Sequence, residues 1–232
     1  MPLTLSDLLA LPSKPLISDI DFPLLQDVYE QVLMPYSYDY LLPDGKRIQV
    51  FFEKHRFCHL LGLESAVKGL FPKNRLNSPA ALAARFQHKA VPGWDGIKNG
   101  SLAIDSFRAY VGRANFNGCK DKLVFFYNLP KLLLSSTAMI RYVPIPTSAI
   151  QCELILFDNY DNAWVHIGLE KETDAETYYP RSFFIERITT SHPISKYVDN
   201  QHAIPISFQR RYARNPIRQT PPKPFPRNRN NR

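Results

Sequence analysis

The chain changes character near its middle, and this change does most to limit the folds open to it. Before residue 134 most apolar residues recur at helical spacing, whereas the second half contains short segments rich in β-branched and aromatic residues. Turn-forming clusters separate these segments, which favours an antiparallel meander. The segments are 139–143, 149–157, 163–169, 182–188 and 203–208. We therefore expect an α+β fold in which N-terminal helices pack on a C-terminal antiparallel sheet of four to five strands.

The first half also contains one expected hairpin among its helices. Segments 36–42 and 47–52 flank Pro43-Asp44-Gly45-Lys46, which predicts two strands joined at an Asp-Gly turn. Ser78-Pro79 has the residue types of a helix N-cap and first helical position. Residues 120–134 are apolar, and their periodicity fits either a helix or a strand. The stretches with helical periodicity are 22–34, 57–70, 79–90 and 101–117.

The excess positive charge of the chain lies at its C-terminus. The 232 residues include 29 Lys and Arg against 21 Asp and Glu. Eight of the basic residues and none of the acidic ones fall within 209–232, so the rest of the chain is neutral. Its content of Pro, Asn and Arg is typical of disorder, whereas the 44% hydrophobic content of the whole chain is typical of a globular protein. We expect an N-terminal arm and helix (1–35), an α+β domain (36–208) and a disordered basic tail (209–232).

Cysteine usage and hydropathy indicate an intracellular protein. The three cysteines form no close pair and no CxxC motif, which argues against a disulfide framework and a zinc ribbon. The N-terminus lacks the basic region of a signal peptide, and no apolar run is long enough to span a membrane. We expect a soluble, cytoplasmic protein with no membrane partner.

A first group of polar residues lies where the second strand of the hairpin runs into a helix. Lys54, His55, Arg56 and His59 gather at this junction. If the helix begins early, His55, Cys58 and His59 share a face and could hold a metal ion, but no further ligand is placed to complete the site. A small buried residue is the better interpretation of Cys58. A core or helix-cap histidine and a catalytic histidine are comparable interpretations of His59.

Two further groups could contact phosphate or RNA. Ser106 and Arg113 are seven residues apart and would face the same way on one helix, where together they could hold a phosphate. A solvated polar stripe explains the same spacing. In Tyr178-Tyr179-Pro180-Arg181-Ser182-Phe183-Phe184, strand alternation puts Ser182 and Phe184 on one face and Phe183 on the other. The aromatic residues and Arg181 could stack a base and contact its phosphate, although tyrosines are common in any sheet.

These three groups together resemble a known family. The stretch Phe57-Cys58-His59-Leu60-Leu61-Gly62-Leu63 is similar to its first signature. Gly100, Ser106 and Arg113 match a second pattern, and Tyr178, Pro180, Ser182, Phe183 and Phe184 match a late one. In this order and spacing they resemble the phage-associated domains of the barnase/EndoU/colicin/RelE-like nuclease superfamily, specifically the fourth phage type. The resemblance covers about residues 36–208.

The resemblance implies helices packed on an antiparallel four-stranded sheet and metal-independent RNA cleavage, often by a toxin. The positions carried over are His59, Ser106, Arg113 and Ser182. Such cleavage uses the 2′-hydroxyl as an internal nucleophile and needs proton transfer and charge stabilisation. His59 would be the general base or acid, with His55 as a weaker candidate for the second one. Arg113 and Lys54 would hold the phosphorane, and Ser106 and Ser182 would orient phosphate oxygens. We expect no cofactor and no metal.

The expected partners are RNA, either tRNA or mRNA, and an antitoxin or immunity protein. Residues expected to contact RNA outside the catalytic group are His55, Arg181, Arg210, Arg211 and Arg214. A rival interpretation is a non-catalytic RNA- or protein-binding module of the same fold, because a second acid or base is not evident. In a third, the basic tail is the main functional part and tethers nucleic acid without sequence preference.

Overall fold

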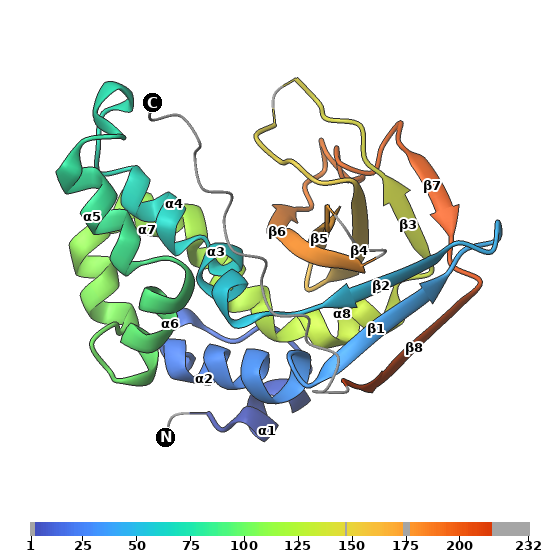
Figure 1. Cartoon of the computed structure of the whole chain (residues 1–232), viewed down its shortest axis with the longest axis horizontal. Coiled ribbons are helices and arrows are strands. Elements are labelled where there is room, and N and C mark those ends of the chain that lie inside the picture. Colours follow the sequence, from blue (N-terminus) through green and yellow to red (C-terminus); the bar gives the residue numbers. More distant parts are fainter. Residues whose placement is uncertain (1–2, 147, 174–176, 215–232) are drawn as a thin grey trace, which may run out of the picture.

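The computed structural model describes residues 3–146, 148–173 and 177–214. Most of its helices gather on one side and its strands on the other, with the first hairpin reaching across to the sheet (Figure 1). The helices are α1 (Leu5–Ala10), α2 (Phe22–Asp27), α3 (Phe57–Leu61), α4 (Leu63–Lys68), α5 (Pro79–Gln87), α6 (Ala90–Lys98), α7 (Ile104–Phe125) and α8 (Leu129–Ser135). The strands are β1 (Tyr36–Leu41), β2 (Arg47–Phe51), β3 (Ala138–Arg141), β4 (Leu154–Tyr160), β5 (Ala163–Lys171), β6 (Thr177–Arg187), β7 (His202–Pro205) and β8 (Phe208–Ala213).

Local signals fix several helix ends where the sequence predicts them. The Ser78 hydroxyl accepts a hydrogen bond from the Ala81 amide at 3.3 Å, with Pro79 as the first residue of α5. The Asp21 carboxylate caps α2 in the same way, at 2.7 Å from the Leu24 amide. The π-helical turn η2 (Val28–Leu33) extends α2 toward Pro35. The apolar stretch 120–134, left open by periodicity, is helical.

The sheet confirms the predicted hairpin and meander but is larger than expected. Its strand order is β7-β3-β4-β5-β6-β2-β1-β8, and β3 to β6 form consecutive antiparallel pairs. The expectation of an antiparallel sheet of four to five strands is corrected to an eight-stranded mixed sheet. It has more strands because the hairpin β1–β2 and the strand β8 join it, and it is mixed because β2 pairs in parallel with β6. The hairpin enters this sheet since its apolar faces, including Tyr40 and Val50, have to be buried in the same core.

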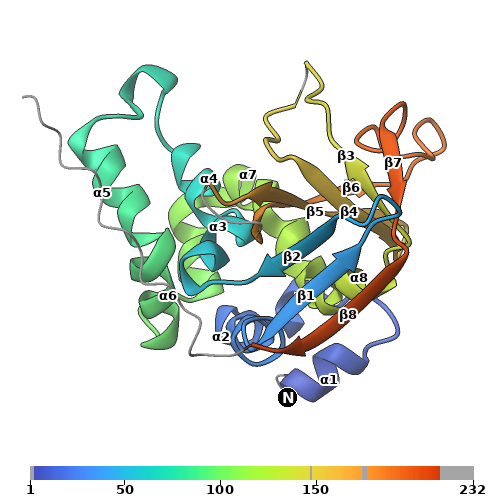
Figure 2. The ribbon, with the colours of Figure 1, turned by 45° about the vertical axis from the view of Figure 1, so that its right-hand side comes forward.

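The sheet curls around α8, so that its two edges approach each other (Figures 1 and 2). The Tyr40 hydroxyl in β1 donates to the Leu133 carbonyl of α8 at 2.8 Å, while Ser135 at the end of α8 donates to Asp158 in β4 at 2.7 Å. The edge strands β7 and β8 are separated in the chain only by Ile206 and Ser207. The curled sheet therefore has an inner face, which packs on α8 and the core, and an outer face.

Both ends of the described chain belong to this fold. Leu8, Phe22 and Leu25, from the expected N-terminal arm and helix, are fully buried in the same core as the sheet. At the other end, residues 209–213 lie in β8 and pair with β1, although the sequence places them in the basic tail. The remainder of that expected tail, residues 215–232, lies outside the described residues.

Among the residues that the structure describes, no helix is both long enough and apolar enough to cross a membrane.

Candidate active site

The junction that carries the expected histidines is a strand that turns directly into a helix. β2 is followed by the 3-10 turn η3 (Lys54–Arg56) and then by α3, as the sequence predicts. Cys58 faces the core and is fully buried, and burial raises the pKa of its thiol to about 12. His55 and His59 are exposed instead, so the three side chains do not share a face. Within the described ranges no group of three or more His, Cys, Asp or Glu could hold a metal ion.

His59 is held against β6 by one nitrogen of its ring. Its Nε2 lies 2.9 Å from the carbonyl oxygen of Arg181. Because a carbonyl oxygen only accepts, Nε2 carries the proton of the neutral ring and Nδ1 is the basic nitrogen. The histidine is therefore oriented by the backbone of a strand more than a hundred residues later in the chain.

A β-bulge in β6 supplies that carbonyl. Gly168 of β5 pairs with Ser182 and Leu169 pairs with Pro180, so Arg181 has no partner in the β5–β6 ladder. The extra residue of a bulge turns its groups away from the regular ladder, and here it presents its carbonyl to α3. The Arg181 side chain forms an ion pair with the neighbouring strand, since its Nε lies 3.3 Å from the Glu170 carboxylate of β5.

A lysine from α7 is the third component of the candidate site, after His59 and the bulge at Arg181. Lys122 lines a pocket of about 200 Å³ together with residues of α4 and α7 and the Gly62 turn. Partial burial lowers the pKa of Lys122, and within the described residues it forms no ion pair. The other lining residues are Gly62, Ser65, Ala66, Ala114, Asn115 and Gly118.

Gly62 allows the turn between α3 and α4 to approach Lys122 closely. Its φ is +79°, a left-handed conformation that favours glycine. A Cβ atom at this position would lie 3.3 Å from the Cδ atom of Lys122 and 3.4 Å from the Cβ atom of Cys119. The glycine thus brings α3, with His59, next to the cation of α7.

These surroundings lower the pKa of His59. Its partial removal from water has the largest effect, and the positive charges of Lys122 and Arg181 lower the pKa further. The hydrogen bond to the Arg181 carbonyl and the charge of Glu64 oppose the shift without reversing it. At neutral pH the ring is therefore an uncharged base beside two cations, which is an arrangement suited to proton transfer at an anionic substrate.

Ser106 and Arg113 do not share a face as expected, because α7 is not continuous between them. Gly112 has φ +74° and ψ 162°, which breaks the helix at that point. The Ser106 hydroxyl bonds to the backbone of Ala103 at the start of α7. Arg113 is exposed and precedes Lys122 by nine residues, which is about two and a half helical turns. It therefore projects from the opposite side of α7, away from the lysine.

The remaining residues of the η3–α3 junction are engaged with neighbours. The Lys54 ammonium pairs with Asp95 of α6 at 2.8 Å and lies 5.7 Å from the Trp94 ring. This contact directs Lys54 toward α6, whereas His59 faces β6. His55 lies beside Glu53, with Nδ1 and the carboxylate 3.4 Å apart.

The late aromatic motif has the predicted alternation but offers little stacking surface. Phe183 is buried in the inner core, while Phe184 belongs to a second apolar cluster on the outer face, which Ser182 shares. Tyr178 is also in the core. The ring of Tyr179 is covered by the Arg56 guanidinium, whose carbon lies 3.8 Å from the ring centroid. The predicted stacking of a base on this motif thus finds no open aromatic ring.

The three C-terminal arginines expected to contact RNA divide between the faces of the sheet. Arg210 pairs with Asp39 on the outer face, whereas Arg211 packs 4.3 Å from the Tyr36 ring on the other side of β8. Arg214 follows the strand and donates to the Phe52 carbonyl at 3.1 Å, next to η3.

The sequence reasoning missed Lys122, although a weak signal is present. Ala114, Gly118 and Lys122 recur every four residues, so two small residues precede the lysine along one side of a helix. Small residues of this kind leave space for the pocket, but only the packing of α4 against α7 shows that the space is enclosed.

One family model matches most of the chain. It is described as phage-Barnase-EndoU-ColicinE5/D-RelE like nuclease 4, and it covers residues 25–219. Neither the curated proteins nor the solved structures contain a match to the chain. The matched region includes every residue of the site described above.

Proposed function

The chain belongs to the phage-Barnase-EndoU-ColicinE5/D-RelE-like nuclease 4 family, and from this premise we propose that it is an endoribonuclease whose active site is formed by His59, Lys122 and Arg181. The observation that carries the proposal is the position of His59. Its ring is fixed through Nε2 by the Arg181 carbonyl, its pKa is lowered, and two cations lie close to it. Membership of a nuclease family indicates that the substrate is nucleic acid. We favour RNA because a base can deprotonate its 2′-hydroxyl, which then acts as the nucleophile, while the cations stabilise the charge on the phosphate.

The proton transfers can be assigned to particular atoms. The Nδ1 atom of neutral His59 accepts the proton of the 2′-hydroxyl as its oxygen attacks phosphorus. The P–O5′ bond breaks, and the leaving oxygen takes a proton to complete the 2′,3′-cyclic phosphate and a new 5′-hydroxyl end. We assign this donation to the protonated form of His55, which is also exposed and precedes His59 by four residues. Because partial burial and the charge of Arg56 lower the pKa of His55, this donor form is most populated under acidic conditions.

We assign stabilisation of the extra negative charge of the phosphorane to the two cations, Lys122 and Arg181. Lys122 lies in the pocket beside Gly62, and Arg181 lies on the bulge of β6. Because both are partly shielded from water, their effect on a developing charge is stronger than at an open surface. Ser182, next to Arg181 in the chain, is proposed to orient a phosphate oxygen. Ser106, Arg113 and Lys54 fall outside this group, so we assign them no step.

The direct test compares RNA cleavage by the full chain and by His59→Asn, with the exposed His192→Asn as a matched control. We expect a loss of about 10²–10⁴-fold in kcat for His59→Asn and none for the control. Lys122→Met should lower kcat without abolishing RNA binding. A folded His59→Asn variant that cleaves at the rate of the unchanged protein would overturn the site. RNA binding without cleavage by the unchanged protein would support the non-catalytic module instead.

We further propose that the enzyme is a toxin-type ribonuclease that needs no metal and is held in check by an antitoxin or immunity protein. The phage-associated family supports the first part, and the 2′-hydroxyl mechanism supports the second, since it uses only proton carriers and cations. Induced expression should arrest growth, and His59→Asn should relieve the arrest. Cleavage should persist in EDTA. Loss of cleavage in EDTA with recovery on adding Mg²⁺ would contradict the metal-independent mechanism.

A further inference from the structure

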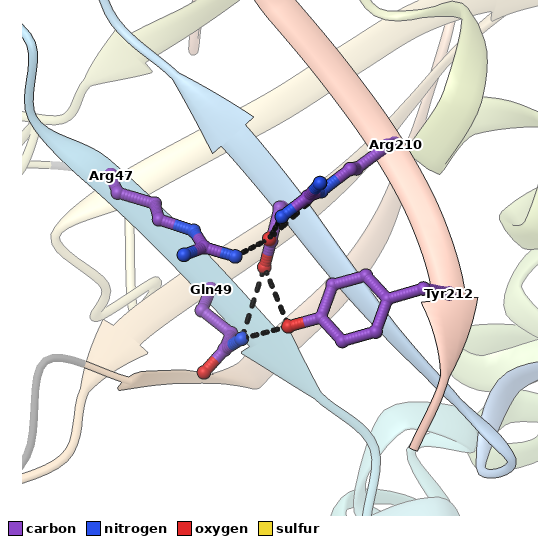
Figure 3. A network of polar contacts seen from close by, with 5 residues as sticks. Arg47, Gln49, Arg210 and Tyr212 are labelled. Atoms are coloured by element: carbon purple, nitrogen blue, oxygen red, sulfur yellow. Dashed lines mark hydrogen bonds and ion pairs between the residues drawn. The ribbon is translucent and has the colours of Figure 1, made fainter. Parts of the chain in front are cut away.

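A polar cluster on the outer face of β1, β2 and β8 is not used by the proposed cleavage site. Asp39 binds all its other members, and its side chain is 4% exposed. Figure 3 shows these members, Arg47, Gln49, Arg210 and Tyr212, pointing toward one another across the strands. The Arg47 guanidinium donates to one carboxylate oxygen, and Arg210 donates to the same oxygen through two nitrogens at 3.3 Å. Gln49 and Tyr212 donate to the other oxygen at 3.1 and 3.3 Å. Both carboxylate oxygens thereby accept hydrogen bonds from the two strands, β2 and β8, that flank β1.

The cluster has more positive charge than the buried carboxylate requires. One arginine neutralises one carboxylate, yet Arg47 and Arg210 both converge on Asp39, and each side chain is 52% exposed. Within the described part of the chain neither arginine pairs with a second acid. A guanidinium has five N–H groups, so each keeps several that point away from Asp39. The outer face therefore presents two oriented guanidinium groups with a net charge of one.

A third arginine connects this cluster to the cleavage site. Arg214 packs 4.6 Å from the Phe51 ring on the outer face and donates to the Phe52 carbonyl, immediately before η3. From Arg47 to Phe51 the strand extends about 13 Å, and His55 and His59 follow. Arg214 also lies 3.8 Å from the Glu53 carboxylate, so its charge is offset there and the net positive charge stays at Arg47 and Arg210. Guanidinium groups thus follow β2 from the cluster toward the histidines.

We propose that Arg47 and Arg210, held in place by Asp39, bind backbone phosphates of an RNA strand several nucleotides from the bond cleaved at His59. The inference rests on the proposed function and adds the path of the substrate. Planar guanidinium groups suit phosphate oxygens because two N–H groups can bind at once. Asp39 acts as a positioning residue, since a buried carboxylate cannot itself approach a phosphate.

Substrate length separates this binding site from the cleavage site. The double variant Arg47→Gln/Arg210→Gln is compared with the unchanged protein on a 20-nucleotide RNA and on a dinucleotide. We expect KM for the long RNA to rise about tenfold or more at low salt, with kcat at saturation unchanged. The slope of log affinity against log salt should fall by about 1.4, as for two lost phosphate contacts on a single strand. Cleavage of the dinucleotide should stay within twofold, because it is too short to reach the cluster.

Controls keep the outcome interpretable. Arg75→Gln removes an exposed arginine from the helical side and should leave all values unchanged. If the double variant fails to fold, the single variants each leave Asp39 one guanidinium and are expected to show half of the change in salt slope. An unchanged KM for long RNA would overturn the inference, as would an equal loss on the dinucleotide. So would variants that bind RNA normally but lose an acidic protein partner.

Binding of 2′-O-methyl RNA, which cannot be cleaved by this chemistry, distinguishes failure of the inference from failure of the proposed function. If the unchanged protein cleaves no RNA but binds this probe through Arg47 and Arg210, the proposed nuclease activity fails and the phosphate site stands. If RNA is cleaved but substitution of both arginines leaves binding of the probe unchanged, the inferred phosphate site is wrong while the proposed nuclease function stands.

Discussion

His59 and its two cationic neighbours determine how cleavage should respond to pH. The ring must be neutral to accept a proton, so kcat/KM rises as pH passes through its pKa, and it falls again at higher pH as His55, the proposed donor, loses its proton. Because burial, Lys122 and Arg181 lower this pKa, the midpoint should lie below the ordinary value of about 6.5. Lys122→Met removes a positive charge, so we expect its acid limb to move to higher pH. Rates measured from pH 4.5 to 8 test this. If the acid limb of Lys122→Met has the same midpoint as that of the unchanged protein, the proximity of Lys122 to His59 would be contradicted.

A second histidine, His166, should make the fold itself sensitive to acid. It is fully buried on the outer face, where Ser195 bonds to its Nε2 at 2.8 Å, and burial lowers its pKa to about 3. Between pH 6.5 and 3 the unfolded chain therefore binds one more proton than the folded one. The free energy of unfolding should fall with decreasing pH in this window, by about 1.4 kcal/mol per pH unit from this group.

The comparison of His166→Asn with the exposed His192→Asn isolates that contribution. Denaturant unfolding at pH 7 should show His166→Asn to be less stable than the unchanged protein, and the difference should shrink as pH falls. His192→Asn should follow the unchanged protein at every pH. A constant difference between His166→Asn and the unchanged protein would show that His166 does not titrate in this range.

At the scale of elements, the turn between α3 and α4 depends on a single glycine. Gly62→Ala places a Cβ atom in a left-handed backbone conformation and against the Lys122 side chain. We expect a loss of about 1–2 kcal/mol in the free energy of unfolding. Gly118→Ala on α7 is the matched control, because its Cβ would meet nothing within 4 Å and should be neutral or stabilising by about 1 kcal/mol. Equal stability of the two variants, measured by urea unfolding, would contradict this account.

Elements with local signals could be predicted from the sequence, and those set by distant contacts could not. The hairpin and the start of α5 depend on turn and cap residues within a few positions. The break in α7 was missed, although Val111 and Phe116 are five residues apart, one more than a regular helical stripe allows. The parallel pairing of β2 with β6 has no local signal, because segments more than 120 residues apart in sequence form it.

The same distinction applies to the candidate active site. His59 could be singled out because it stands in a recognisable motif at a strand–helix junction. Its orienting partner is a backbone carbonyl, and no residue type marks a carbonyl in a sequence. Arg181 was identified through its charge, while its position on a bulge depends on the register of β5 against β6. The position of Lys122 in the site depends on the packing of α4 against α7, which the sequence does not show.

At the scale of the whole molecule, part of the C-terminal charge follows the end of the family match in the sequence. Residues 220–232 include four Lys and Arg and no acid, and they follow the end of the family match. Their deletion should weaken RNA binding mainly at low salt and reduce the slope of log affinity against log salt by up to about 3. The rate at saturating RNA should not change. A large fall in that rate, measured against salt-matched unchanged protein, would place the deleted segment in the active site.

The pairing of β8 with β1 also has a consequence for biosynthesis. The two strands lie near opposite ends of the described chain, and β8 supplies Arg210 to the cluster around Asp39. Contacts between such distant segments form late and slowly, because the loop between them must first be closed. A ribosome producing this protein must therefore have translated the chain through β8 before the sheet can be completed. Until β8 is in place, the nascent chain lacks Arg210 and with it the complete arginine pair that we propose binds RNA.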